Sequence, residues 1–170
     1  MKKLLFGIVF VFISTTLFAQ RYAFVDTDYI LNNIPAYKAA QDKLNKLSED
    51  WQKEVEVGYA EVDVMLKDFN TEKILLTEEM IKQRKLEISA KEKFVKDLQR
   101  RFFGPGGELF KKRQDFIKPI QDEIYNVIKE IAEKGNYAII FDTAAGATIL
   151  FTDPKFDKSD EVLEKLGYKN

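Results

Sequence analysis

Apolar residues recur at helical spacing over one long stretch of the chain, from about residue 36 to residue 134. Between residues 36 and 70 the steps are three or four residues, which matches the period of an amphipathic helix. The apolar positions are Tyr37, Ala40, Leu44, Leu47, Trp51, Val55, Gly58, Val62, Leu66 and Phe69. This stripe is one residue wide in most turns, so it predicts a long helix with the narrow seam of a coiled coil.

A second helical stretch follows a short tip at residues 70–76. Thr77 precedes two glutamates, a pattern that favours a helix N-cap with an acidic first turn. The seam then recurs at seven-residue steps, at Ile81, Ile88, Val95, Phe102, Leu109 and Phe116, and it becomes fully apolar near the base, at Ile117, Ile120, Ile124, Val127, Ile128 and Ile131. Arg84 and Lys91 interrupt the distal seam, where we expect loose, hydrated packing. Together the two stretches predict an antiparallel helical hairpin over residues 36–134.

The second arm is interrupted by Gly104, Pro105, Gly106 and Gly107, with phenylalanines on both sides. Proline within a helix removes a hydrogen bond and clashes with the preceding turn, and glycine adds backbone freedom. We therefore expect a break at 104–107. Two interpretations stay open: a hinge that lets the arm flex, or a local loop with no mechanical role.

Short β-prone segments enclose the hairpin. Residues 22–26 form the first, and residues 137–142 and 147–152 are predicted to pair as a β-hairpin. Gly135 is expected to end the long helix in a left-handed conformation. A short helix from Asp160 to Leu166, closed by Gly167, is predicted at the end of the chain.

These segments predict an α+β fold in which the hairpin projects from a small β body. The body would consist of residues 20–35 and 135–170. Three strands are too few for a stable sheet alone, so association between subunits would complete the core. Candidate oligomer-core residues are Phe24, Ile140 and Leu150.

The first nineteen residues have the pattern of a secretory signal peptide. Lys2 and Lys3 precede an apolar run, and cleavage is expected near Ala19/Gln20. An N-terminal membrane anchor is the alternative, but the apolar run is short of the ~20 residues that a bilayer span needs. Export with a lysine-rich start suggests a bacterial envelope protein located in the periplasm.

Cleavage would leave 151 residues, enough for one domain. Without Lys2 and Lys3, 25 basic residues face 28 acidic ones, a net charge of −3 that argues against nucleic acid as a partner. The chain has no cysteine, so no disulfide can stabilise it outside the cell. Its stability must come from packing, which we expect to include packing between subunits.

The two arms differ in charge. Residues 38–79 hold 6 basic and 11 acidic residues, and residues 82–118 hold 12 basic and 5 acidic ones. We expect these opposite charges to pair the arms with each other, as flanking charges of coiled coils do. The alternative is that the basic arm presents a surface to an acidic lipid or protein.

The composition excludes most catalytic chemistry. The chain has no histidine and no cysteine, so it lacks an ordinary proton shuttle at neutral pH and a thiol nucleophile. Asp26, Asp28, Asp142 and Asp153 lie at predicted strand ends, where aspartates usually serve as turn and cap residues; convergence on a metal ion is the less favoured alternative. We therefore predict no catalytic, metal or cofactor site, and we predict that the protein is not an enzyme.

The order of these segments and several of their residues resemble the Skp/OmpH family of periplasmic chaperones. The resemblance covers essentially the whole mature chain and is carried by residues 23–31, 137–142, 149–153 and 157–163. It implies a homotrimer in which three hairpins project as tentacles from a joint β body around a cavity. Family members hold unfolded outer-membrane proteins there without ATP. The slightly acidic charge and the break at 104–107 depart from the best-known members.

The resemblance predicts an ATP-independent holdase for unfolded outer-membrane or envelope proteins, with at most transient contact with a membrane surface. A structural coiled-coil adaptor that tethers one folded envelope partner is the alternative. A narrow seam cannot hide large rings completely, so we expect aromatic residues of the first arm to contact clients. The candidates are Trp51, Tyr59 and Phe69.

Overall fold

The computed structural model describes residues 21–146 and 149–168 of the 170-residue chain, and the predicted signal peptide lies outside these residues. The described chain forms two compact units. Residues 34–123 form the first, called the hairpin below. Residues 21–33 together with those from 124 onward form the second, called the body.

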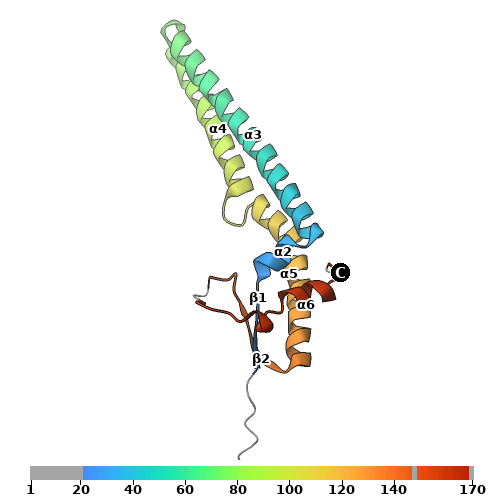
Figure 1. Ribbon diagram of the computed structural model, residues 1–170. Helices are drawn as coiled ribbons and strands as arrows, with labels where there is room; N and C mark the ends of the chain where they lie inside the picture. Colours follow the sequence, from blue (N-terminus) through green and yellow to red (C-terminus); the bar gives the residue numbers. More distant parts are fainter. Residues whose placement is uncertain (1–20, 147–148, 169–170) are drawn as a thin grey trace, which may run out of the picture. The chain divides into compact units, whose positions relative to one another are not determined.

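Two long helices, α3 (Pro35–Glu72) and α4 (Glu78–Phe103), lie side by side in the hairpin (Figure 1). Pro35 occupies the first turn of α3, where its missing N–H is not needed. A short 3-10 turn, η1 (Lys73–Leu75), joins the arms. The Thr77 side chain then caps α4 by accepting a hydrogen bond from the N–H of Met80. The prediction of two antiparallel arms is confirmed, and the first arm ends two residues later than expected.

The predicted seam forms the core between the arms. Its buried residues are Val55, Val62 and Phe69 from α3, and Ile88, Val95, Leu98 and Phe102 from α4. Gly58 also belongs to this seam, because a Cβ atom there would lie 2.8 Å from the Val95 Cγ2 atom. The glycine thus allows the two helices to approach closely. Leu98 is the core residue that the seven-residue spacing did not predict.

A third long helix, α5 (Glu108–Gly135), follows the break in the second arm. Its first part belongs to the hairpin, where Ile117 packs with Ala40 and Leu44 of α3. Pro119 lies inside this helix and withholds one backbone donor from it. The second arm therefore consists of two helices, as the glycine and proline residues predicted.

The body contains a two-stranded parallel sheet, β1 (Arg21–Val25) with β2 (Tyr137–Asp142). Phe24 is paired with Phe141 in this register, and their rings lie 5.9 Å apart. The predicted β-hairpin after residue 137 is wrong. Residues 149–152 are in no strand, and residues 147–148 of that prediction lie outside the described chain. Parallel strands need a long connection, which the helices α2 to α5 provide here.

Three short elements complete the body: α2 (Thr27–Asn32), η2 (Pro154–Phe156) and α6 (Ser159–Lys165). Helix α2 contacts α6. The buried hydroxyl of Ser159 accepts a hydrogen bond from the Asp26 N–H (2.8 Å) and donates one to Asp157 Oδ1 (2.6 Å). The N–H of Lys158 also donates to the Phe24 carbonyl (2.8 Å). These bonds fix the C-terminal segment to the N-terminal strand.

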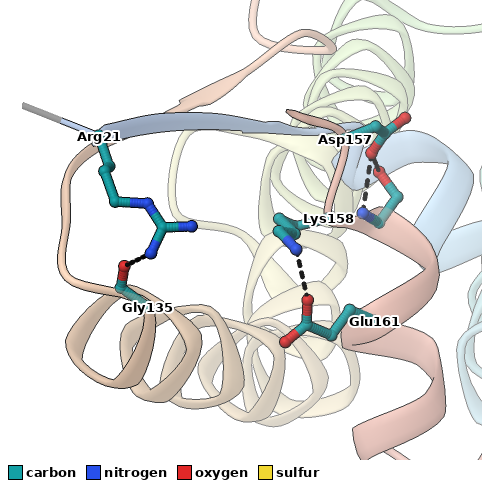
Figure 2. Close-up of polar contacts among 6 residues, drawn as sticks. Arg21, Gly135, Asp157, Lys158 and Glu161 are labelled. Carbon is teal, nitrogen blue, oxygen red and sulfur yellow. Dashed lines mark hydrogen bonds and ion pairs between the residues drawn. The ribbon is translucent and has the colours of Figure 1, made fainter. Parts of the chain in front are cut away.

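Further polar contacts of the body appear in Figure 2. The Arg21 guanidinium donates to the carbonyl of Gly135 (2.8 Å), and Lys158 pairs with Glu161 (2.8 Å). The hydrogen bond from Lys158 to the Glu161 carboxylate raises the pKa of that lysine, and the nearby Tyr137 adds to the effect. Both cations also lie near the Tyr137 ring, at 4.8 Å for Arg21 and 5.8 Å for Lys158.

The end of α5 differs from the prediction in one residue. Asn136, rather than Gly135, adopts the left-handed conformation, with φ 50°. Asparagine tolerates this region better than most residues because its short polar side chain can bond locally. Gly135 is required for another reason: a Cβ atom there would lie 2.2 Å from the Tyr137 ring. The predicted final helix is confirmed, with Gly167 at φ 79° after it.

Candidate functional site

The break in the second arm has a defined backbone geometry. Helix α4 ends at Phe103 and α5 begins at Glu108. Between them, the Gly104 N–H donates to the Arg100 carbonyl (2.8 Å), and the Gly107 N–H donates to the Gly104 carbonyl (2.8 Å). The chain thus leaves α4 through two consecutive hydrogen-bonded turns.

Each of the three glycines is required by this geometry. A Cβ atom on Gly104 would lie 2.4 Å from the Arg100 carbonyl oxygen, and one on Gly107 would lie 2.8 Å from that of Arg101. Gly106 has φ 69°, which other residues rarely adopt. The predicted break is confirmed, and the backbone at all three glycines excludes ordinary side chains.

An apolar groove with a volume of about 400 Å³ lies at the break and is called the break groove below. Its lining side chains are Phe102, Phe103, Pro105, Leu109, Phe110 and Arg113. Phe102 is buried, but Phe103 is 39% exposed and Phe110 is 52% exposed. Large aromatic surfaces that remain exposed next to a concave site are typical of binding regions.

A second groove of about 380 Å³ lies between α3 and α4 and is called the glutamine groove below. It is lined by Gln52, Val55, Glu56, Tyr59, Gln99 and Phe103. The Tyr59 hydroxyl donates to Gln99 Oε1 across the two arms (3.0 Å). Phe103 lines both grooves, so the two concave regions meet at one exposed ring.

The three predicted contact residues have different positions. Tyr59 is exposed at the surface and lines the glutamine groove. Trp51 is half-buried and stacks on Phe102, with ring centroids 4.8 Å apart and an interplanar angle of 4°. Phe69 is buried in the hairpin core. The expectation that Phe69 contacts clients is therefore corrected, because its ring is buried in the seam.

The sequence pattern did not indicate Phe103 and Phe110 as contact residues. They flank the glycine and proline residues, and that position was the available signal, because a break interrupts the regular spacing that directs apolar side chains into the seam. Other exposed apolar residues lie elsewhere on the hairpin, at Val57, Val64, Ile74, Leu75, Met80, Leu86 and Phe94.

Some charged side chains of the two arms form ion pairs with each other. The Lys91 Nζ atom lies 2.5 Å from Glu61 Oε2, and Arg84 lies 3.7 Å from Glu72. These are the two basic residues that interrupt the seam, so the expected arm pairing is confirmed at those positions. Other basic residues of the second arm have no ion pair within the described part of the chain, among them Lys82, Lys85, Lys93, Arg100, Arg101 and Arg113.

The body exposes apolar side chains too. Phe24 and Ile140, two of the predicted oligomer-core residues, are half-buried, and Leu150, the third, is 95% exposed. Phe151 is 81% exposed, and Ile139 on β2 is 52% exposed. The sheet and the segment after it thus leave apolar surface uncovered in the single chain.

Three of the four aspartates at predicted strand ends, Asp26, Asp142 and Asp153, serve as turn and cap residues, as expected. Asp26 caps α2 and Asp153 caps η2. Asp142 accepts hydrogen bonds from the Thr27 N–H (3.2 Å) and hydroxyl (2.7 Å). Within residues 21–146 and 149–168, no three acidic residues gather in a way that could hold a metal ion. None of the helices in these same ranges is long and apolar enough to cross a membrane.

Comparison with known families gives the assignment. The sequence model of the family described as "Outer membrane protein (OmpH-like)" matches residues 21–166, which include both arms, the break and the body. The chain belongs to the OmpH-like family. This confirms the resemblance to Skp/OmpH chaperones, and because that family is non-enzymatic, it also confirms that the protein is not an enzyme.

The fold agrees with a solved member of the family. A candidate outer membrane chaperone (OmpH-like) from Caulobacter crescentus CB15 matches with a TM-score of 0.68 and 14% sequence identity. The match covers 86% of this chain and 83% of that one. At this identity the likeness concerns the fold alone. A search of curated proteins by sequence finds no match.

Proposed function

We propose that this OmpH-like protein is an ATP-independent holdase, which binds unfolded outer-membrane proteins and prevents their aggregation. One observation carries the proposal: the hairpin exposes aromatic and aliphatic side chains along its arms, with two open grooves that meet at Phe103. Dispersed, shallow apolar contacts suit a binder that must accept many sequences without imposing one fold.

The proposed holdase acts as a homotrimer. A two-stranded sheet is marginal by itself, and the body leaves Ile139, Leu150 and Phe151 exposed in the single chain. Association of three bodies through Phe24, Ile140 and Leu150 would cover this surface and place three hairpins around a shared cavity. Clients would be held between these hairpins.

The trimer is tested by Ile140→Asp and Leu150→Asp. Each change would place an unpaired carboxylate in the proposed interface, which costs several kcal/mol. We expect the mass measured by light scattering to fall to that of the single chain. Val64→Asp on the hairpin, where the side chain is 55% exposed, serves as the control. A trimeric mass for both body variants would rule out this interface.

The proposed location is the periplasm, after removal of a signal peptide near Ala19/Gln20. The family and the sequence pattern of the first nineteen residues support this location. The measurement is the mass of the protein isolated from the periplasmic fraction of an expressing bacterium. An intact N-terminus would favour an anchored form instead.

The holdase activity is tested with unfolded β-barrel proteins diluted from denaturant. We expect the protein to suppress light scattering from several unrelated barrels at low micromolar concentration, without ATP. A structural adaptor would ignore all of them and bind one folded partner. Protection of no unfolded barrel protein would therefore reject the holdase proposal.

A further inference from the structure

We propose that the break groove binds an aromatic side chain with a neighbouring carboxylate, presented by an extended segment of an unfolded client. This inference rests on the proposed holdase function and adds a defined recognition site to it. The groove belongs to the hairpin and is formed by the end of α4, the glycine and proline residues and the start of α5.

The size and lining of the groove suit a single large apolar side chain. Its volume is about 400 Å³, within the range in which proteins bind small ligands. Phe102 and Phe103 meet edge to face, with centroids 6.2 Å apart and an interplanar angle of 76°. An incoming ring could join this pair in the arrangement that aromatic side chains prefer. Pro105 and Leu109 add apolar walls.

The charges around the groove select for a negative neighbour. Arg113 lines the groove, and no carboxylate does. Arg100 and Arg101 occupy the last turn of α4, immediately before the glycine. None of these three arginines has an ion pair within the described residues, whereas Glu108 at the start of α5 is already paired with Lys111 (3.2 Å). The Arg101 guanidinium lies over the Phe102 ring (4.7 Å), so Arg113 is the arginine that an acidic client residue would meet in the groove without an ion-pair partner.

The glutamine groove offers a comparison within the same hairpin. It has a similar volume, about 380 Å³, but its lining includes the carboxylate of Glu56 and two glutamines. A negative charge would be repelled there. The preference for an aromatic residue beside a carboxylate should hence belong to the break groove and not to the glutamine groove.

The test uses three fluorescent peptides with one flexible, extended host sequence. The first carries Phe and Asp two residues apart, so that both point to the same side of an extended chain. The second has Lys in place of Asp, and the third has Ala in place of Phe. Binding to the purified full-length assembly is measured by fluorescence anisotropy. We expect the first peptide to bind about tenfold more tightly than the third, as burial of one aromatic ring implies.

Two variants locate the site. Phe110→Gln should reduce binding of the first peptide about tenfold, while Phe94→Gln, which alters a ring 59% exposed on α4, should leave binding unchanged. Arg113→Glu should remove the preference for Asp over Lys, a change of about two- to fivefold for an exposed charge. Lys85→Glu is its control for net charge. If Phe110→Gln lowers the helix content, the preference of the Arg113→Glu variant for Asp over Lys alone decides whether the peptide binds in the break groove.

The possible results distinguish the binding site in the break groove from the proposed holdase activity. Equal binding by the Phe110→Gln and Phe94→Gln variants, or an Asp preference unchanged in Arg113→Glu, would overturn the site. A change in mass of Phe110→Gln without loss of peptide binding would also overturn it, because a second copy of the chain would then occupy the groove. Suppressed aggregation alongside any of these results keeps the holdase proposal and removes only the groove.

Discussion

The hairpin and the body differ in how much polar contacts contribute beside their apolar cores. The hairpin core is a row of apolar side chains from α3 and α4, and few polar contacts cross between its arms. The body also buries apolar side chains, among them Ile30, Val162 and Leu163, but it adds hydrogen bonds between segments more than 110 residues apart. Examples are Thr27 with Asp142 and Asp26 with Ser159. Its sheet joins residues 21–25 to residues 137–142.

This difference determines how each unit responds to substitutions. The apolar seam between the arms does not depend on the side chains at the exposed flanks. The hairpin can therefore display many apolar side chains there without losing its fold. The hydrogen bonds of the body need particular partners at particular positions, and a lost partner leaves a polar group unsatisfied. The exposed residues of the hairpin can therefore vary while the body keeps its structure.

The largest expected effect is that of a charge in the body. Val162 on α6 is fully buried, so Val162→Asp should destabilise the protein by more than about 3 kcal/mol, because the carboxylate would lose its hydration. Val64→Asp on the exposed flank of α3 should cost less than about 1 kcal/mol. Thermal unfolding followed by circular dichroism measures both. Equal melting temperatures would contradict the burial of Val162 in the body.

The next effect concerns the hairpin core. Phe102→Ala should cost about 3 kcal/mol, because it removes a buried ring and the stacking partner of Trp51. Trp51 is the only tryptophan of the chain, so its emission reports this position directly, and we expect a shift to longer wavelength. Phe94→Ala is the exposed control. An unchanged emission would mean that Trp51 does not depend on Phe102 for its packing.

A stabilising change is expected at the break. Replacing Gly104, Pro105, Gly106 and Gly107 by alanines should join α4 to α5 and add about 1–3 kcal/mol, since proline and glycine disfavour helix. Gly106→Ala alone should cost about 1 kcal/mol, because the bend keeps its φ of 69°. Denaturant unfolding compares the two variants.

The same alanine variant tests the hinge. If the break lets the arm adapt to its cargo, the continuous helix should protect a narrower range of client sizes in the aggregation assay. Equal protection of small and large clients would mean that the break is not a hinge. The break groove would then be the only function proposed for this segment.

The smallest effect is a pH dependence in the body. Hydrogen bonds from Lys134 and then Lys165 hold the pKa of Glu130 below its ordinary value of 4.5. The resulting stabilisation is complete above pH 4.5 and is lost as the pH falls through the lowered pKa of the folded protein. Lys165→Met should raise the Glu130 pKa towards 4.5, measured by NMR titration. Lys129→Met, which alters the pair with Glu133, should leave it unchanged.

The sequence predicted the hairpin far better than the body. The arms follow from local spacing, and the break from residues that no straight helix tolerates. The pairing of β1 with β2 has no local signal, because their partners are set by a long connection. The run from Ile149 to Thr152 has strand composition but no strand partner in the single chain. Composition alone could not distinguish a run that pairs in the sheet, such as β2, from one that does not, such as residues 149–152.

The sequence predicted the break but not a candidate contact site beside it. The sequence placed a break among phenylalanines, yet it favoured the rings of the first arm. Helical phase cannot tell whether a ring faces the seam or lies at its margin: Phe69 is buried, whereas Tyr59 is exposed. That difference depends on which turn of the opposite helix lies across from each residue, and only the structure supplies it.

The parallel pairing of β1 and β2 also orders events during synthesis. The N-terminal strand emerges first, but its partner in β2 follows more than 110 residues later, and Lys158, which donates to Phe24, comes later still. The hairpin can form meanwhile from contacts within its own sequence, which shortens the loop that the pairing of β1 with β2 must close. A chain that ended before residue 158 would lack the hydrogen bond to Phe24 and the contact of α6 with α2. The body is therefore complete only after α6 has been synthesised.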